Sequence, residues 1–141
     1  MLLATNTSWI GIDDAIEARV EVPVVGPTGA LLSDIDLLVR TDSRIVVVEY
    51  KLARVPMHEY KRRHSALSQL ERIDRRFASV FGFAPDLVYA YGDRFTYEHV
   101  RSGTRFRTAP DLGDVARVLA GTSSGGFLNG SRRLPPYGAM G

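Results

Sequence analysis

Two apolar segments separated by only a few residues constrain the fold of this chain more than any other feature. The first covers residues 32–40, the second covers residues 44–52, and Thr41-Asp42-Ser43 joins them. Both segments are apolar at consecutive positions in their middles, which is typical of strands covered on both faces by other layers. A connection this short joins antiparallel neighbours, so we predict a hairpin buried at the centre of a layered domain.

The segments around this hairpin predict an α/β domain. Alternating apolar residues over 18–25 predict an earlier strand, and Pro23 indicates that this strand lies at an edge or contains a bulge. Apolar residues at spacings of three and four predict a helix over about residues 57–81; they are Ala66, Leu70, Ile73, Phe77 and Phe81. We also predict a short helix over 8–17, strands at 87–91, 94–100 and 104–108, and a helix over 112–120 capped by Asp111. The alternating aromatic residues Tyr89, Tyr91, Phe95 and Tyr97 we interpret as core. This order of elements predicts a three-layer α/β fold with a mixed central sheet flanked by helices.

Composition excludes several classes of protein. The 141 residues fit one domain of ordinary size, and without cysteine there is no disulfide framework and no thiolate zinc site. No apolar run approaches the roughly 18 residues that span a bilayer, and the N-terminus lacks a signal-peptide pattern. We therefore expect a cytoplasmic protein with no membrane partner. We divide the chain into one domain over residues 1–120 and a Gly-rich tail over 121–141, which we expect to be flexible.

Charged residues lie at the ends of the two apolar strands. In a symmetric hairpin centred between residues 42 and 43, the numbers of paired residues sum to 85, so Asp36 lies opposite Glu49 and Asp34 opposite Lys51. Directly opposed side chains have Cβ atoms about 4.5–5.5 Å apart. Two carboxylates this close repel unless a cation lies between them, and Mg²⁺ or Mn²⁺ suits such oxygen ligands. Lys51 shares a strand face with Glu49 and is placed to orient a water or to stabilise charge on a phosphate. The pattern indicates metal-assisted hydrolysis of a phosphodiester.

Asp36 followed by Glu49-Tyr50-Lys51 resembles the signature of the PD-(D/E)xK nuclease superfamily, which has a restriction-endonuclease-like fold. The resemblance covers roughly residues 16–120, and the short hairpin is most similar to resolvase-like and NERD-like members. It implies that Asp36, Glu49 and the backbone carbonyl of Tyr50 bind Mg²⁺, with Mn²⁺ able to substitute, and that Lys51 positions the attacking water. Ile35 stands where the family often has proline. The family's acidic residue on a preceding helix matches no single position; the alternatives are Asp13, Asp14 and Glu17, of which we favour Glu17 as a further catalytic residue.

Positive charge is concentrated just after this signature. Residues 54–77 contain seven Lys or Arg and three acids, a balance of +4 within a chain whose formal net charge is +2. On a helical projection Arg62, Gln69, Arg72 and Arg76 share one polar stripe. We predict that four arginines contact nucleic-acid phosphates, namely Arg54, Arg62, Arg72 and Arg76. Ser68-Gln69-Leu70 resembles the glutamine that several nuclease subfamilies place beside the metal, so we include Gln69 among the catalytic residues.

The sequence therefore predicts a metal-dependent deoxyribonuclease, an endonuclease that acts as a homodimer on DNA. RNA is an alternative substrate, as in a tRNA-cleaving toxin, because the same site serves either polymer. A third hypothesis is a nucleic-acid-binding module that keeps the fold without activity, since a missing N-terminal acid leaves a weakened site. The purely structural alternative is that the hairpin charges form a salt bridge at the end of a sheet and that the arginine stripe is only solvated.

Overall fold

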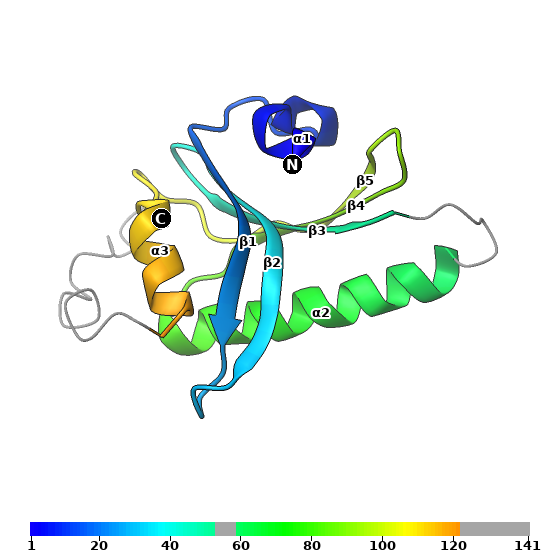
Figure 1. Cartoon of the computed structure of the whole chain (residues 1–141). Coiled ribbons are helices and arrows are strands. Elements are labelled where there is room, and N and C mark those ends of the chain that lie inside the picture. The colour runs from blue at the N-terminus through cyan, green and yellow to red at the C-terminus, as the bar shows by residue number, and fades with distance from the viewer. Residues whose placement is uncertain (53–58, 122–141) are drawn as a thin grey trace.

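A five-stranded mixed sheet forms the middle layer of the protein in the computed structural model, which describes residues 1–52 and 59–121 (Figure 1). Its strands are β1 (Glu17–Val25), β2 (Leu31–Arg40), β3 (Ile45–Lys51), β4 (Asp86–Tyr91) and β5 (Thr96–Arg101). They lie side by side in chain order. Only β3 and β4 are parallel, and the helix α2 (Glu59–Val80) lies in the connection between them. The predicted α/β class and mixed sheet are confirmed.

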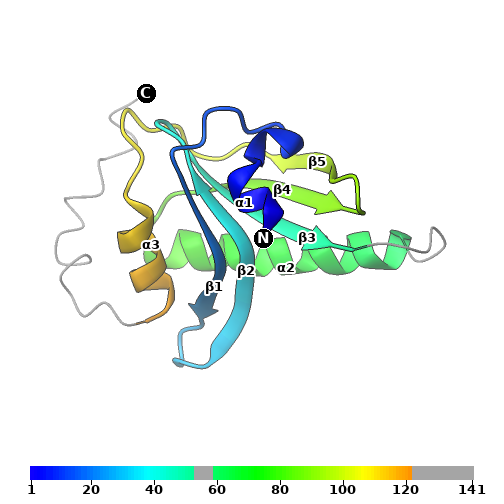
Figure 2. The same ribbon diagram turned by 45° about the horizontal axis from the view of Figure 1, so that its top comes forward.

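Helices cover both faces of the sheet. α2 and the short α3 (Leu112–Leu119) lie on one face, while α1 (Leu2–Thr5) and the 3₁₀ helix η1 (Thr7–Ile10) lie on the other (Figures 1 and 2). The predicted apolar stripe of α2 is buried throughout; Ala66, Leu70, Ile73 and Phe77 are fully buried and Phe81 nearly so. Gly82 ends this helix with a positive φ of 81°, and its N–H donates to the carbonyls of Phe77 and Ala78. The sheet is therefore the middle of three layers.

Each face of β3 belongs to a different core. Ile45 and Val47 pack in the cluster on the α2 face, whereas Val46 and Val48 pack with Leu3 and other N-terminal residues on the opposite face. All four β3 residues are at most 1% exposed. This strand is apolar at consecutive positions because both of its faces are covered, as the sequence predicted.

The N-terminal segment differs from the prediction. Instead of one helix over 8–17, two single-turn helices are followed by a segment without regular secondary structure, and the Ile16 N–H donates to the Arg40 carbonyl. The residues buried here are Leu3, Ile10 and Ile12, whereas Trp9 and Ile16 are about half exposed. Helical periodicity between Trp9 and Ile16 was therefore misleading. The strand predicted at 104–108 is also absent from the described residues, whereas the predicted cap holds, because the Asp111 side chain accepts from the N–H groups of Gly113 and Asp114.

Two predictions concern parts of the chain that lie outside the described residues. They are the phosphate contact of Arg54 and the properties of the Gly-rich tail from residue 122 onward. Within residues 1–52 and 59–121, none of the helices has the length and apolar character needed to cross a membrane.

Candidate active site

The pairing of β2 with β3 has the predicted register. Leu37 lies opposite Val48 and Arg40 opposite Ile45, so paired numbers sum to 85. The ladder ends at Leu37 and Val48, and the next position holds Asp36 and Glu49. There the Tyr50 N–H donates to the Asp36 carboxylate over 2.8 Å, so a side chain accepts this N–H where the ladder stops. The ladder does not continue to Asp34 and Lys51, which a fully symmetric hairpin would pair.

Glu49 is a buried acid at the end of an apolar strand face. It follows Ile45 and Val47 on the face covered by α2 and is only 1% exposed. Within the described part of the chain, neither of its carboxylate oxygens has a hydrogen-bond partner of good geometry. Burial, and next the adjacent Asp36 carboxyl group, raises the pKa of Glu49 from 4.5 to about 9, although Lys51 acts in the opposite direction. At neutral pH Glu49 therefore keeps its proton unless a cation compensates its charge.

Lys51 and Tyr50 complete the group that the sequence predicted. The Lys51 ammonium lies 3.6 Å from a Glu49 carboxylate oxygen, which is an ion-pair distance but too long for a strong hydrogen bond. The Tyr50 N–H points toward β2, where it meets Asp36. Because the N–H and C=O of one strand residue point to the same side, the Tyr50 carbonyl is directed toward that side as well. Two carboxylates and a carbonyl are ligands that suit Mg²⁺ or Mn²⁺, so the residues present fit a divalent cation.

The backbone of the neighbouring strand is strained at this point. Val20 pairs with Leu37 and Val22 with Ile35, which places Glu21 of β1 across from Asp36. Glu21 is exposed and has a φ of +53°, a left-handed conformation that costs a non-glycine residue on the order of 1–3 kcal/mol. Ile35 and Leu37 are two residues apart and would face the same side of a regular strand, yet they belong to different cores. The backbone of β2 is therefore twisted at Asp36, between them. The ladder between β2 and β3 ends at this point, next to the acidic pair.

The acids considered for the N-terminal catalytic position do not reach this pair. Glu17 lies opposite Arg40 and forms an ion pair with it over 2.8 Å, four residues along β2 from Asp36. Asp14 pairs with Arg44 beside the β2–β3 turn, and Asp13 is exposed near it in sequence. Within residues 1–52 and 59–121, no three acidic or histidine side chains gather closely enough to hold a metal ion. The strand register also places Glu21 of β1 across from Asp36, which the sequence did not predict, but its exposed side chain does not complete such a group.

Gln69 and the arginines of α2 extend from the acidic pair along the helix. The Gln69 amide donates to the Ser33 hydroxyl over 2.6 Å and more weakly to the Asp34 carbonyl, so it ties α2 to β2 beside Asp36 rather than contacting the acids. Arg62 donates to the Leu52 carbonyl over 2.6 Å, directly after Lys51. Arg72 and Arg76 lie farther along the helix and border a cavity with the β1–β2 hairpin.

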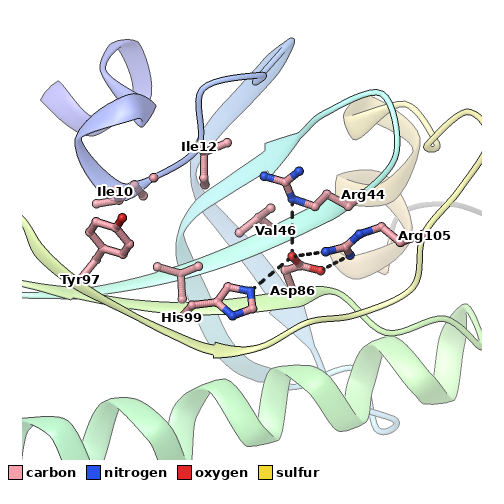
Figure 3. Close-up of a pocket in the computed structure, with 10 residues that line it drawn as sticks. Ile10, Ile12, Arg44, Val46, Asp86, Tyr97, His99 and Arg105 are labelled. Carbon is pink, nitrogen blue, oxygen red and sulfur yellow. Dashed lines mark hydrogen bonds and ion pairs between the residues drawn. The ribbon is translucent and has the colours of Figure 1, made fainter.

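A second polar cluster surrounds Asp86 on the opposite face of the sheet (Figure 3). Asp86 is 3% exposed. Its carboxylate oxygens lie 2.7 Å from a guanidinium nitrogen of Arg105, 3.5 Å from the Nε of Arg44 and 3.5 Å from the Nε2 of His99. Burial alone would raise the pKa of Asp86, but hydrogen bonds from Arg105 and the Gly103 N–H outweigh it and hold the pKa below its ordinary value. The carboxylate thus ties β4 to the β2–β3 turn and to the segment after β5. The sequence around Asp86, a single acid before an apolar strand, does not predict these partners.

Comparison with protein-family models, with curated proteins and with solved structures found no match to this chain.

Proposed function

We propose that this chain is a metal-dependent nuclease that hydrolyses phosphodiester bonds in DNA, with the layered arrangement of the restriction-endonuclease-like nucleases. The observation that carries the proposal is the buried Glu49 carboxyl group with the half-buried Asp36 and with Lys51 beside it. A protein gains nothing in stability by burying an acid that has no good hydrogen-bond partner next to a second acid. Binding of a divalent cation supplies a reason for this arrangement.

The roles of the residues follow from their positions. Asp36, Glu49 and the Tyr50 carbonyl would hold Mg²⁺, or Mn²⁺ in its place. When bound, the ion supplies a Lewis acid that lowers the pKa of a coordinated water and neutralises charge on the phosphate. Lys51 orients the attacking water and stabilises negative charge that develops on the phosphate oxygens. Gln69 is a positioning residue, since it fixes α2 against β2 next to Asp36.

The arginines of α2 supply the positive surface that a polyanion needs. Arg62, Arg72 and Arg76 extend over fourteen residues of helix, which is about 21 Å. The expected partner is therefore a nucleic-acid strand that follows α2 past the acidic pair. DNA is the proposed polymer, and a homodimer is the proposed state in the cytoplasm, because two-fold symmetry is the simplest way to cut both strands.

One observation favours a second candidate function. The two acids have no third acidic ligand within the described residues, so a binding module without catalytic activity is the alternative. That alternative predicts salt-sensitive binding of nucleic acid with no metal-dependent cleavage. RNA cleavage is tested in the same assay by including intact tRNA as a substrate.

The decisive experiment measures cleavage of plasmid DNA, branched DNA and tRNA with Mg²⁺, Mn²⁺ or EDTA. Asp36→Asn is the informative variant, because asparagine still accepts the Tyr50 N–H but removes the charge. Asp34→Asn is the matched control, since Asp34 is an exposed acid on the same strand. We expect metal-dependent cleavage by wild type and Asp34→Asn and none by Asp36→Asn. Equal activity of wild type and Asp36→Asn with every metal would refute the catalytic assignment.

A further inference from the structure

The β1–β2 hairpin crosses α2 in both ribbon views (Figures 1 and 2). A cavity of about 300 Å³ is lined by residues of these two elements. Residues of the hairpin and of one face of α2 line it; they are Pro27, Leu32, Arg72, Arg75, Arg76 and Ser79. Three guanidinium groups thus border one small space whose other wall is apolar. Its volume is at the lower end of the range for small-ligand sites.

Among the residues that the structure describes, part of this positive charge has no ion-pair partner. Arg75 forms an exposed ion pair with Glu71 over 2.7 Å. Arg72 and Arg76 form no ion pair within the described residues, and the Nε of Arg76 is buried without a hydrogen-bond acceptor. Leaving a buried donor unsatisfied is unfavourable, and more so for a charged group. An anionic oxygen satisfies such a donor, and guanidinium groups are well matched to phosphate.

The cavity lies near the acidic pair along both β2 and α2. Leu32 is four residues from Asp36 on β2, which is at most about 13 Å along the strand. Gln69 lies between them and binds Ser33, the residue after Leu32. On α2, Arg76 is seven residues beyond Gln69, about 10 Å along the axis. A strand leaving the acidic pair along α2 therefore reaches the arginine cavity within a few nucleotides.

We propose that this cavity binds a backbone phosphate a few nucleotides from the bond that is cut, so that the substrate is an oligonucleotide or a longer strand and not a mononucleotide ester. This inference rests on the proposed nuclease function. At the 3.4 Å axial rise of one B-DNA strand, about 13 Å corresponds to about four nucleotides, and to fewer in an extended strand. The phosphate in the cavity fixes the register of the strand, while Asp36, Glu49 and Lys51 act on another phosphate.

Binding of end-labelled oligothymidylates of about two to ten nucleotides, measured by fluorescence anisotropy in EDTA, tests this inference without cleavage. We expect the affinity of wild type to rise in a step at about four nucleotides. The double variant Arg72→Gln/Arg76→Gln should lose the step and bind the longest oligonucleotide about tenfold more weakly. Its salt dependence should fall by about 1.4 in the slope of log K against log salt, the value for two phosphates of a single strand.

Arg63→Gln is the matched control, because Arg63 lies on the same helix but pairs with Glu98 of β5. It should keep the step. The single variant Arg72→Gln, at an exposed position, tests the same point if the double variant is poorly folded. A double variant that matches Arg63→Gln at every length would overturn the inference. The outcomes remain separable: a length step without any metal-dependent cleavage refutes the nuclease proposal and leaves the phosphate site, whereas cleavage without a length step refutes the phosphate site alone.

Discussion

Replacing Glu49 by glutamine should stabilise the metal-free protein. The folded-state pKa of Glu49 is about 9, against an ordinary value of 4.5, so the folded state holds a proton that the unfolded state releases between these values. The free energy of unfolding therefore falls as pH rises from about 4.5 to about 9, by at most about 1.4 kcal/mol per pH unit. At pH 7 the accumulated cost is on the order of 3 kcal/mol. Glutamine keeps the shape of the side chain and has no such cost.

The expected signs are opposite for stability and for activity. Glu49→Gln should raise the free energy of unfolding at pH 7 in EDTA by up to about 3 kcal/mol, and this gain should vanish near pH 4.5. The same change should abolish metal-dependent cleavage, because an amide is a poor cation ligand. A gain in stability with a loss of activity is the trade-off expected where a strained site is kept for function.

Urea unfolding followed by circular dichroism at several pH values measures the effect. Glu98→Gln is the control: Glu98 is 39% exposed and paired with Arg63, so its loss should change stability by less than about 1 kcal/mol. A Glu49→Gln variant that is less stable than wild type at pH 7 would show that Glu49 is not protonated in the metal-free protein. Glu49 would then be ionised and stabilised by Lys51.

Three further predictions concern other parts of the molecule. Asp86→Asn should lower the free energy of unfolding by about 3 kcal/mol at pH 7, because it leaves Arg105 beside a neutral group. Since the pKa of Asp86 is lowered in the folded state, the difference in stability between variant and wild type should shrink as pH falls below about 4. Equal urea midpoints at pH 7 would contradict this prediction. Glu21→Gly should raise the free energy of unfolding by about 1 kcal/mol, since glycine adopts the positive φ without strain, and a lower melting temperature would exclude this account. Gln69→Ala should cost about 1 kcal/mol and speed hydrogen exchange around Ser33, whereas unchanged exchange there would show that the tie does not hold β2.

The central hairpin was predictable because its signals are local. The two apolar runs determine the strands, and the short connection after Arg40 determines the register in which they pair. A slip of one residue in this register would expose side chains that are now buried. The stripe from Ala66 to Phe77 fixed α2 for the same reason. Within this part of the fold, pattern and packing agree.

The remaining features depend on contacts between distant segments. Leu3, Ile10 and Ile12 are buried because the sheet offers an uncovered apolar face, and single-turn helices satisfy that packing without helical periodicity. Strand alternation predicts that Tyr97 lies in the core, but Tyr97 is 47% exposed, because β5 lies at the edge of the sheet. Likewise Phe95 lies just before β5, with a φ of +52° and its ring stacked on Trp9, rather than within a strand. Strand alternation in the sequence does not reveal that Tyr97 is exposed or that Phe95 lies outside the strand.

The connection between the two parallel strands has a consequence for how the protein folds. Residues 26–30 and 41–44 join the first three strands, whereas β4 meets β3 only after residues 52–85. Short loops close at lower entropic cost, so we expect the antiparallel strands to pair first and the closure of the long segment to limit the rate. Asp36 and Glu49 then meet while still hydrated, and Glu49 loses its water only when α2 and β4 close over it. Refolding in EDTA should accordingly slow between about pH 5 and about pH 8 in wild type but not in Glu49→Gln. Refolding rates that do not change with pH would place the burial of this acid after the barrier.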